Sequence, residues 1–444
     1  MKTLKKQSGY ALLVFVSLML AAASAVAVKA INNNGNSQIA RDKLTAAALA
    51  QAKEALIGYA VSVDLSSSTR RPGDLPCPDI NNNGITDTPC GNASGSTGQT
   101  LRIGRLPWKT LGISDLRDGS GERLWYAVSN NFKFSTRTSC TSAGQAGCLN
   151  SDTVGSISVF SPDGAQLNDG GGSTGVVAVI LAPGEILKRT DQPSPQDRSD
   201  TGINNPQNYL DTALGEDNAN FTDGSSTNGF IQGRAKDISN NVILNDQLLA
   251  ITQDEIMRPI QKRVAGEVKN CLNDYALHNN NRYPWATPIT DLSHTYNDNS
   301  DTYFGRIPDD LSHTKSDSGN LMNDRWEIIC NTHTAHTPSP WWINWKEMVF
   351  YGLANAYKPV NPPTTPPVCP TCIVVNPPSS TADKKIVVIV AGRALTTTTP
   401  PQVRNSNTDK QTLSNYLEDA NKIGASPFIQ GSASTSFNDI VVFQ

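Results

Sequence analysis

Two strongly apolar runs decide the fold of this chain: VVAVILAPGEIL at residues 176–187 and IVVIVAGRAL at residues 386–395. In each run, β-branched and aliphatic residues follow one another until a turn that contains glycine, a pattern typical of a buried β-strand. Because the two runs are so similar, they indicate that one structural unit occurs twice.

Further similar segments occur in the same order around both runs, which supports an internal duplication. The matching pairs are residues 104–107 with 305–308, residues 124–132 with 349–357, Cys140 and Cys148 with Cys369 and Cys372, residues 208–211 with 415–418, residues 230–233 with 428–431, and residues 245–246 with 438–439. We therefore expect two tandem modules, residues 38–251 and residues 252–444.

Each module is expected to begin with a helix. Residues 38–60 place Ala and Leu at helical spacing, and a second helix is expected near Thr252, where Thr252 and Glu255 form a capping-box pattern. Pro259 should kink this second helix or mark its true start. A helix packed on an antiparallel sheet would bury the apolar faces of both elements, so the expected class is α+β.

The amino terminus has the pattern of an export signal. Residues 1–9 are short and basic, and residues 10–28 carry no charge. As a helix, residues 10–28 would span about 28 Å, close to the thickness of the hydrocarbon layer of a membrane. Two cleavage sites fit: one after Gly9, and one for a conventional signal peptidase near residues 25–30, which would remove the apolar segment.

Gly9 followed by Tyr10, behind a basic segment and before an apolar run, resembles the leader of type IV prepilins. The family usually has Glu at the fifth mature position, where this chain has Val14, so the chain is more similar to a minor or tip subunit. Residues 118–126 also resemble a signature of the pseudopilins of type II secretion, with Ser120 in place of its Trp. The sequence is thus similar to the type IV pilin and type II secretion pseudopilin family.

This resemblance implies a leader at residues 1–9, an apolar anchor helix and break at residues 10–37, and two pilin-like modules. It also implies a structural subunit of a type IV pilus or type II secretion filament, and no enzyme. The implied partners are other pilin or pseudopilin subunits, which pack through the anchor helix, and a prepilin peptidase that cuts between Gly9 and Tyr10. The protein would lie in the inner membrane with a periplasmic domain, and later in a cell-surface or periplasmic filament.

The composition agrees with export. Of the 444 residues, 38% are hydrophobic and 17% are charged, and Asn, Ser, Thr, Gly and Pro are abundant, as in loop-rich exported proteins. The formal net charge is -3, and removal of the leader lysines would make it more negative. Because phosphate binding needs clustered Lys and Arg, we expect no nucleic-acid partner.

The eight cysteines form an even set, which in an exported protein predicts four disulfides. Spacing alone leaves their connectivity open. The pairs that lie close in sequence are Cys77 with Cys90, Cys140 with Cys148, and Cys369 with Cys372, which leaves Cys271 and Cys330 to pair at longer range. The Cys369 and Cys372 pair has the spacing of a redox motif, but no helix is expected after it, so a structural staple is favoured.

The best local signal for a ligand is a loop at residues 79–87. Oxygen donors at alternate positions, a glycine for the sharp turn and an acid at the ninth position are typical of calcium loops. The predicted ligands are Asp79, Asn81, Asn83, Ile85 through its carbonyl, and Asp87. Only two of these are carboxylates, and an Asn- and Gly-rich turn without an ion is the alternative.

Two other clusters allow two interpretations each. Cys330, His333 and His336, with Cys271 or His294, have zinc-like spacing, but a disulfide between Cys271 and Cys330 is favoured. The tryptophans at positions 341, 342 and 345 could form an exposed platform for sugars or another subunit, although core packing is favoured.

We find no nucleophile elbow, no zincin motif and no phosphate-binding glycine loop in the sequence. The alternatives to a filament subunit are a conventionally secreted adhesin or binding protein and, less favoured, a secreted hydrolase that pairs two carboxylates.

Overall fold

The computed structural model describes residues 37–65, 70–88, 103–133, 140, 148–219, 229–297, 300–308, 340–360 and 366–444. Four α-helices lie within these residues: α2 (Ser37–Val61), α3 (Gln253–His278), α4 (Pro340–Trp345) and α5 (Asn407–Lys410). Short 3-10 helices connect other elements: η1 (Asn130–Phe132), η2 (Pro206–Asn208), η4 (Lys346–Met348), η5 (Asn355–Tyr357), η6 (Leu413–Asn415) and η7 (Asn421–Ile423).

Two four-stranded antiparallel sheets form the centres of the two halves of the molecule. The first sheet has the order β1 (Ile103–Arg105), β2 (Trp125–Val128), β5 (Val176–Ala182) and β11 (Gln247–Thr252). The second has the order β12 (Phe304–Arg306), β13 (Val349–Leu353), β16 (Ile386–Val390) and β17 (Ile440–Phe443). The two strand orders are equivalent in sequence order, with the strongly apolar runs as β5 and β16.

The repeated Gly-Arg pair has a steric reason in both sheets. Gly104 lies opposite Tyr126 and Gly305 lies opposite Tyr351 in the strand registers. A Cβ atom on either glycine would collide with a backbone carbonyl of a neighbouring segment, that of Asp79 or Thr287. Only glycine therefore allows this close approach.

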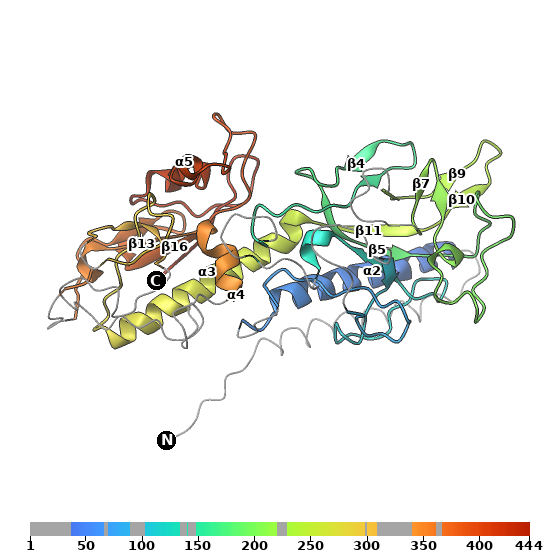
Figure 1. The fold of residues 1–444 in the computed structure, drawn as a ribbon, viewed down its shortest axis with the longest axis horizontal. Coiled ribbons are helices and arrows are strands. Elements are labelled where there is room, and N and C mark those ends of the chain that lie inside the picture. Colours follow the sequence, from blue (N-terminus) through green and yellow to red (C-terminus); the bar gives the residue numbers. More distant parts are fainter. Residues whose placement is uncertain are drawn as a thin grey trace, which may run out of the picture.

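One long helix covers each main sheet. Figure 1 shows α2 along the first sheet and α3 along the second, on the same side of the molecule, with the two halves next to each other along its long axis. In α2, Ala52, Leu56 and Ala60 are fully buried, and their spacing of four places them on one face. The capping box of Thr252 and Glu255 is present, and α3 begins before Pro259, which lies inside the helix.

The two halves share a continuous hydrophobic core. One cluster of buried residues contains Leu56 of α2 and Ile180 of β5 together with Val268 of α3 and Val388 of β16. A smaller cluster on the other face of the first sheet contains Trp125 and Tyr209. The shared cluster implies that the halves stabilise each other.

The smaller sheets are local ribbons between the main strands. They consist of β3 (Val159–Phe160), β4 (Gln166–Asn168) and β8 (Phe230–Ile231); β6 (Thr212–Ala213) and β7 (Glu216–Asp217); β9 (Ala235–Lys236) and β10 (Val242–Leu244); and β14 (Ile373–Val375) and β15 (Ser379–Lys384).

The fold predicted from the sequence is wrong. The prediction was an α+β fold with an apolar N-terminal helix and two modules, each with a helix on one antiparallel sheet. None of the helices among the described residues could span a membrane. The strands there form six sheets, and β3 pairs with β8 in parallel. The polar connections, rich in Asn, Gly and Pro, pair among themselves as short ribbons because turn residues end each strand early.

We predict that Leu56→Ala lowers the free energy of unfolding by about 2–5 kcal/mol, because the substitution leaves a cavity in the shared core. Ile39→Ala in the same helix is the control, since Ile39 is 56% exposed, and should change stability by less than about 0.5 kcal/mol. Urea denaturation measures both values. Equal effects of the two substitutions would contradict the packing of α2.

Candidate functional site at the junction of the two halves

A segment of the first half, residues 148–154, is inserted against the second half. Its first residue, Cys148, forms a disulfide with Cys140. The backbone N–H of Leu149 donates to Asn344 Oδ1 at 2.8 Å, and the hydroxyl of Ser151 donates to the carbonyl of Ala391 at 2.7 Å. We call residues 148–154 the junction segment.

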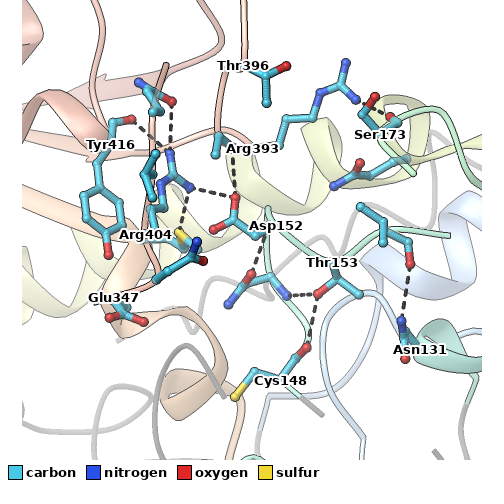
Figure 2. Close-up of a pocket in the computed structure, with 18 of the residues that line it drawn as sticks. Asn131, Cys148, Asp152, Thr153, Ser173, Glu347, Arg393, Thr396, Arg404 and Tyr416 are labelled. Atoms are coloured by element: carbon cyan, nitrogen blue, oxygen red, sulfur yellow. Dashed lines mark hydrogen bonds and ion pairs between the residues drawn. The ribbon is translucent and has the colours of Figure 1, made fainter. Parts of the chain in front are cut away.

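An ion pair fixes the junction segment to the second half. Asp152 Oδ1 lies 2.8 Å from Arg404 Nη1 and also accepts from the backbone N–H of Ala394 at 2.9 Å. Figure 2 shows Arg404 directed at Asp152, with Tyr416 beside the guanidinium. The side chain of Arg404 is only 7% exposed, so its charge requires a partner.

The first half contains an equivalent arginine with an acid of its own. Arg198 donates to the carbonyls of Asn208 and Gly184, as Arg404 donates to those of Asn415 and Gly392. The acid near Arg198 is Glu122, at 3.2 Å and within the same half. In the second half, the corresponding position next to the arginine is filled by Asp152 from the first half.

A cavity of about 640 Å³ lies beside this ion pair. The first half contributes Asn131, Thr153 and Ser173 to its wall, and the second half contributes Glu347 and Arg393. Glu347 pairs with Lys410 at 3.0 Å, and Arg393 donates to the carbonyl of Ser173. Arg393 thus links the two halves at this wall, whereas the pair of Glu347 with Lys410 lies within the second half.

The lining of this cavity combines two carboxylates, Asp152 and Glu347, with two arginines, Arg393 and Arg404. It contains no histidine, and its cysteine, Cys148, is in a disulfide. Among the described residues, no group of three His, Cys, Asp or Glu side chains is placed to hold a metal ion.

Each half also buries an arginine against aromatic rings. The guanidinium of Arg105 lies 4.1 Å from the ring centre of Trp125 and 4.0 Å from that of Tyr209. Arg306 lies 5.0 Å from Phe350 and 4.8 Å from Tyr416. Burial lowers the pKa of Arg105 to about 10, but the group stays charged at neutral pH, so these are cation–π contacts.

None of these arginines was predicted as a site residue from the sequence. The repeated Gly-Arg pair marks Arg105 and Arg306 and was a usable signal. Arg198 and Arg404 stand outside the matched segments and carry no such mark.

Buried carboxyl pairs lie next to the arginines in equivalent positions. Asp246 Oδ2 accepts from the backbone N–H of Asp211 at 2.8 Å, and Asp439 Oδ2 accepts from that of Glu418 at 3.2 Å. The Oδ1 atoms of Asp246 and Asp439 are buried, and neither has an N–H or O–H donor within the described residues. A proton shared within each pair would satisfy these atoms.

The pKa values agree with proton sharing. Burial raises the pKa of Asp211 to about 6. Burial, and then the neighbouring acid, raise the pKa values of Asp246 and Asp439 well above the usual range.

The five predicted calcium ligands lie in one loop that is closed by its own hydrogen bonds. Both carboxylate oxygens of Asp79 accept backbone N–H groups, from Asn83 at 3.1 Å and from Gly84 at 2.6 Å. Asp87 accepts from the Asn81 amide at 2.7 Å, and Asn83 Oδ1 accepts from the N–H of Ile85 at 2.8 Å. These hydrogen bonds give the polar groups of the loop partners within the loop itself. Calcium binding stays a prediction.

The structure bears out two predicted disulfides, Cys140 with Cys148 and Cys369 with Cys372. Cys77 and Cys271 are also disulfide-bonded. Cys90, Cys330, His333, His336 and the processing residues Gly9 and Tyr10 lie outside the described residues.

The tryptophans do not form an exposed platform. Trp341, Trp342 and Trp345 are at most 1% exposed and belong to the shared core. Their spacing in α4 and the apolar residues that follow explain this burial.

Comparison with known proteins found no matching family model, no similar curated protein and no similar solved structure.

We predict that Asp152→Asn lowers the free energy of unfolding by about 1–3 kcal/mol, because Arg404 would keep a buried charge without its counterion. Asp42→Asn is a matched control, since it removes an ion pair with Arg234 whose side chains are about 40% exposed, and should cost less than about 1 kcal/mol. Chemical denaturation compares the two. A smaller effect of Asp152→Asn than of the control would contradict the role of this pair.

The carboxyl pairs predict that stability falls as pH rises. A carboxyl with a raised pKa in the folded state binds its proton more tightly there than in the unfolded chain. Its stabilising effect is complete below the unfolded pKa of about 4 and is lost as pH rises through 6 and above. The loss approaches roughly 1.4 kcal/mol per pH unit for each shifted group.

Asp246→Asn combined with Asp439→Asn should flatten this dependence, because an amide stays neutral and can still donate to the neighbouring acid. Asp200→Asn changes an exposed carboxyl and serves as the control. Urea denaturation at pH 4, 6 and 8 measures the slope. An unchanged slope in the double variant would show that the pairs do not share protons.

Proposed function

We propose that this chain is a non-enzymatic structural subunit of the pilin type, built into a type IV pilus or a type II secretion filament. The observation that carries this proposal is the sequence around Gly9 and Tyr10, where a basic segment meets an uncharged run as in prepilin leaders. Its partners would be other pilin or pseudopilin subunits and the prepilin peptidase. The protein would pass from the inner membrane, with a periplasmic domain, into a cell-surface or periplasmic filament.

The described residues support a structural role because their buried charged side chains make contacts within the protein. The buried arginines stack on aromatic rings and donate to backbone carbonyls, as Arg306 does with the carbonyls of Glu347 and Lys410. Arg189 is paired with Asp191 and Asp217, both at 2.9 Å. Such contacts stiffen a scaffold.

We further propose that the modules 38–251 and 252–444 arose by internal duplication. The equivalent strand orders, the equivalent contacts of Arg198 and Arg404, and the two carboxyl pairs support it. A polar network of this kind is difficult to obtain twice by chance because each member needs a partner at hydrogen-bonding distance.

The alternative is a conventionally secreted adhesin or binding protein. Val14, at the position where the pilin family usually has Glu, favours this alternative. The two proposals differ in the mature amino terminus, which makes that terminus the decisive test.

We predict that the protein isolated from its native membrane begins at Tyr10, as read by amino-terminal sequencing and intact mass. Gly9→Val should block cleavage and leave the precursor, because a small residue is needed before the cut. Ala27→Val alters the conventional site and should have no effect. A mature terminus near residue 28 or 31 would reject the filament proposal and select the secreted alternative.

A further inference from the structure

Exposed aliphatic side chains gather around the end of the first half at which α2 begins. They belong to the first turn of α2, to the segment after β5 and to the hairpins β6–β7 and β9–β10. Figure 1 shows β9 and β10 at the end of the molecule that lies away from the second half. We call this surface the apolar end, and its exposed residues are Ile39, Ile186, Leu214, Ile238 and Val242.

Ion pairs hold the start of α2 against the neighbouring segments. Asp42 of α2 pairs with Arg234 at 2.6 Å, and Arg41 pairs with Glu185, the residue before Ile186. A cavity of about 230 Å³ is lined by these four charged residues, and its wall includes Val242 of β10. The first turn of α2, the segment after β5 and the β9–β10 hairpin therefore lie next to one another.

The two hairpins pack on each other. A small apolar cluster joins Ala213 of β6 with Ala235 of β9 and Leu244 of β10. Leu214 follows Ala213 directly in the chain, so it lies at the margin of this cluster. Both hairpins thus belong to the same surface as the start of α2.

Leu214 has a backbone conformation that is unfavourable for leucine. The turn between β6 and β7 consists of Leu214 and Gly215, whose φ angles are +55° and +90°. Two-residue turns of this kind favour Asn, Asp or Gly at the first position, because other side chains are unfavourable in the left-handed region. Leu214 is also 61% exposed. Neither turn geometry nor packing within the protein accounts for a leucine at this position.

Ile238 lies at the tip of the other hairpin. The turn between β9 and β10 is built by Asp237, whose Oδ1 accepts from the backbone N–H groups of Ser239 at 2.9 Å and Asn241 at 2.8 Å. Ile238 takes no part in these bonds and is fully exposed. Both hairpin tips therefore present an aliphatic side chain to whatever lies outside.

Charge does not dominate this surface. Exposed cations lie beside the aliphatic residues, at Lys188 and Lys236. The acids near them each accept from an arginine or from a backbone N–H, and they are Asp42, Glu185, Glu216, Asp217 and Asp237. A partner of this surface is therefore recognised mainly by apolar contact.

The length of the chain before α2 indicates what covers the apolar end. α2 begins at Ser37, and the uncharged run of the sequence ends at Val28. The residues between these positions can span at most about 30 Å in any conformation. With residues 10–28 in a bilayer, as the proposed function requires, the start of α2 lies within that distance of the bilayer surface.

We propose that the apolar end docks on the surface of the bilayer, where Leu214 and Ile238 enter the interfacial layer. This inference rests on the proposed function, because the anchor brings the surface to the lipid. Aliphatic side chains gain free energy when they leave water, and the adjacent lysines can reach the lipid headgroups. Contact with lipid also gives a reason for a leucine in a turn that favours asparagine.

The test uses the full-length protein in vesicles of phosphatidylethanolamine and phosphatidylglycerol. Ser239→Cys, next to Ile238 in the exposed turn, carries a fluorescent label, and Thr408→Cys, exposed in α5 of the second half, carries the same label as the control. Quenching by aqueous iodide should be several-fold weaker at position 239 than at position 408. Quenching by a nitroxide on the lipid headgroup should be several-fold stronger, at low and at high salt.

Leu214→Asn combined with Ile238→Asn should remove the difference between the two labels. Because asparagine suits the first position of the turn, Leu214→Asn alone should not lower the free energy of unfolding, so misfolding cannot explain a loss of contact. Ile423→Asn removes an aliphatic side chain from the second half, where Ile423 is 71% exposed. This control should leave the quenching unchanged.

Flotation of the vesicles after an alkaline carbonate wash separates the two proposals. Protein that floats but shows equal quenching at both labels overturns the docking and leaves the filament proposal standing. Protein that the wash removes has no embedded anchor, which rejects the filament proposal together with the docking that rests on it. Contact that is lost at high salt, or that persists in the double variant, overturns the docking through aliphatic side chains.

Discussion

The arrangement of this molecule depends on a buried cation whose counterion comes from the other half of the chain. Arg404 sits under Tyr416, bound to backbone carbonyls, and its carboxylate partner is Asp152 of the junction segment. Separation of the halves would leave this guanidinium buried and unpaired, which is far more costly than exposing a surface pair. The same movement would break the contacts of Ser151 and open the shared core.

The repeated polar residues bury charged groups in the same way in both halves. Each half packs one tyrosine against two arginines and buries a carboxyl pair. An asparagine donates to one acid of each pair, Asn218 in the first half and Asn421 in the second. The exception is the acid near the outer arginine. It belongs to the first half in both cases, as Glu122 and as Asp152, so the duplicated units are not independent of each other.

Local features were readable from the sequence. The helix expected over 38–60 is α2, and the capping box at Thr252 correctly places the start of α3, because periodicity and capping depend on neighbouring residues. The apolar runs at 176 and 386 are the central strands β5 and β16. Two disulfides between cysteines close in sequence were also found.

Long-range features were not readable. The contact of Asp152 with Arg404 joins residues 252 positions apart, and nothing in the neighbouring sequence of either residue specifies it. The same holds for the hydrogen bonds of Gln253 and Gln261 with Ser151, which lies in the other half. The predicted fold failed for a related reason, since strand periodicity does not say whether a short strand joins a main sheet or forms a ribbon of its own.

Native-state hydrogen exchange on the backbone amides of β5 and β16 can decide whether the junction makes the two halves one cooperative unit. These strands are the buried centres of the two sheets. If the halves form one unit, the most protected amides of both strands open with the same free energy and respond equally to added denaturant. A clearly lower opening free energy in one of the two strands would show that the halves unfold separately, and would contradict it.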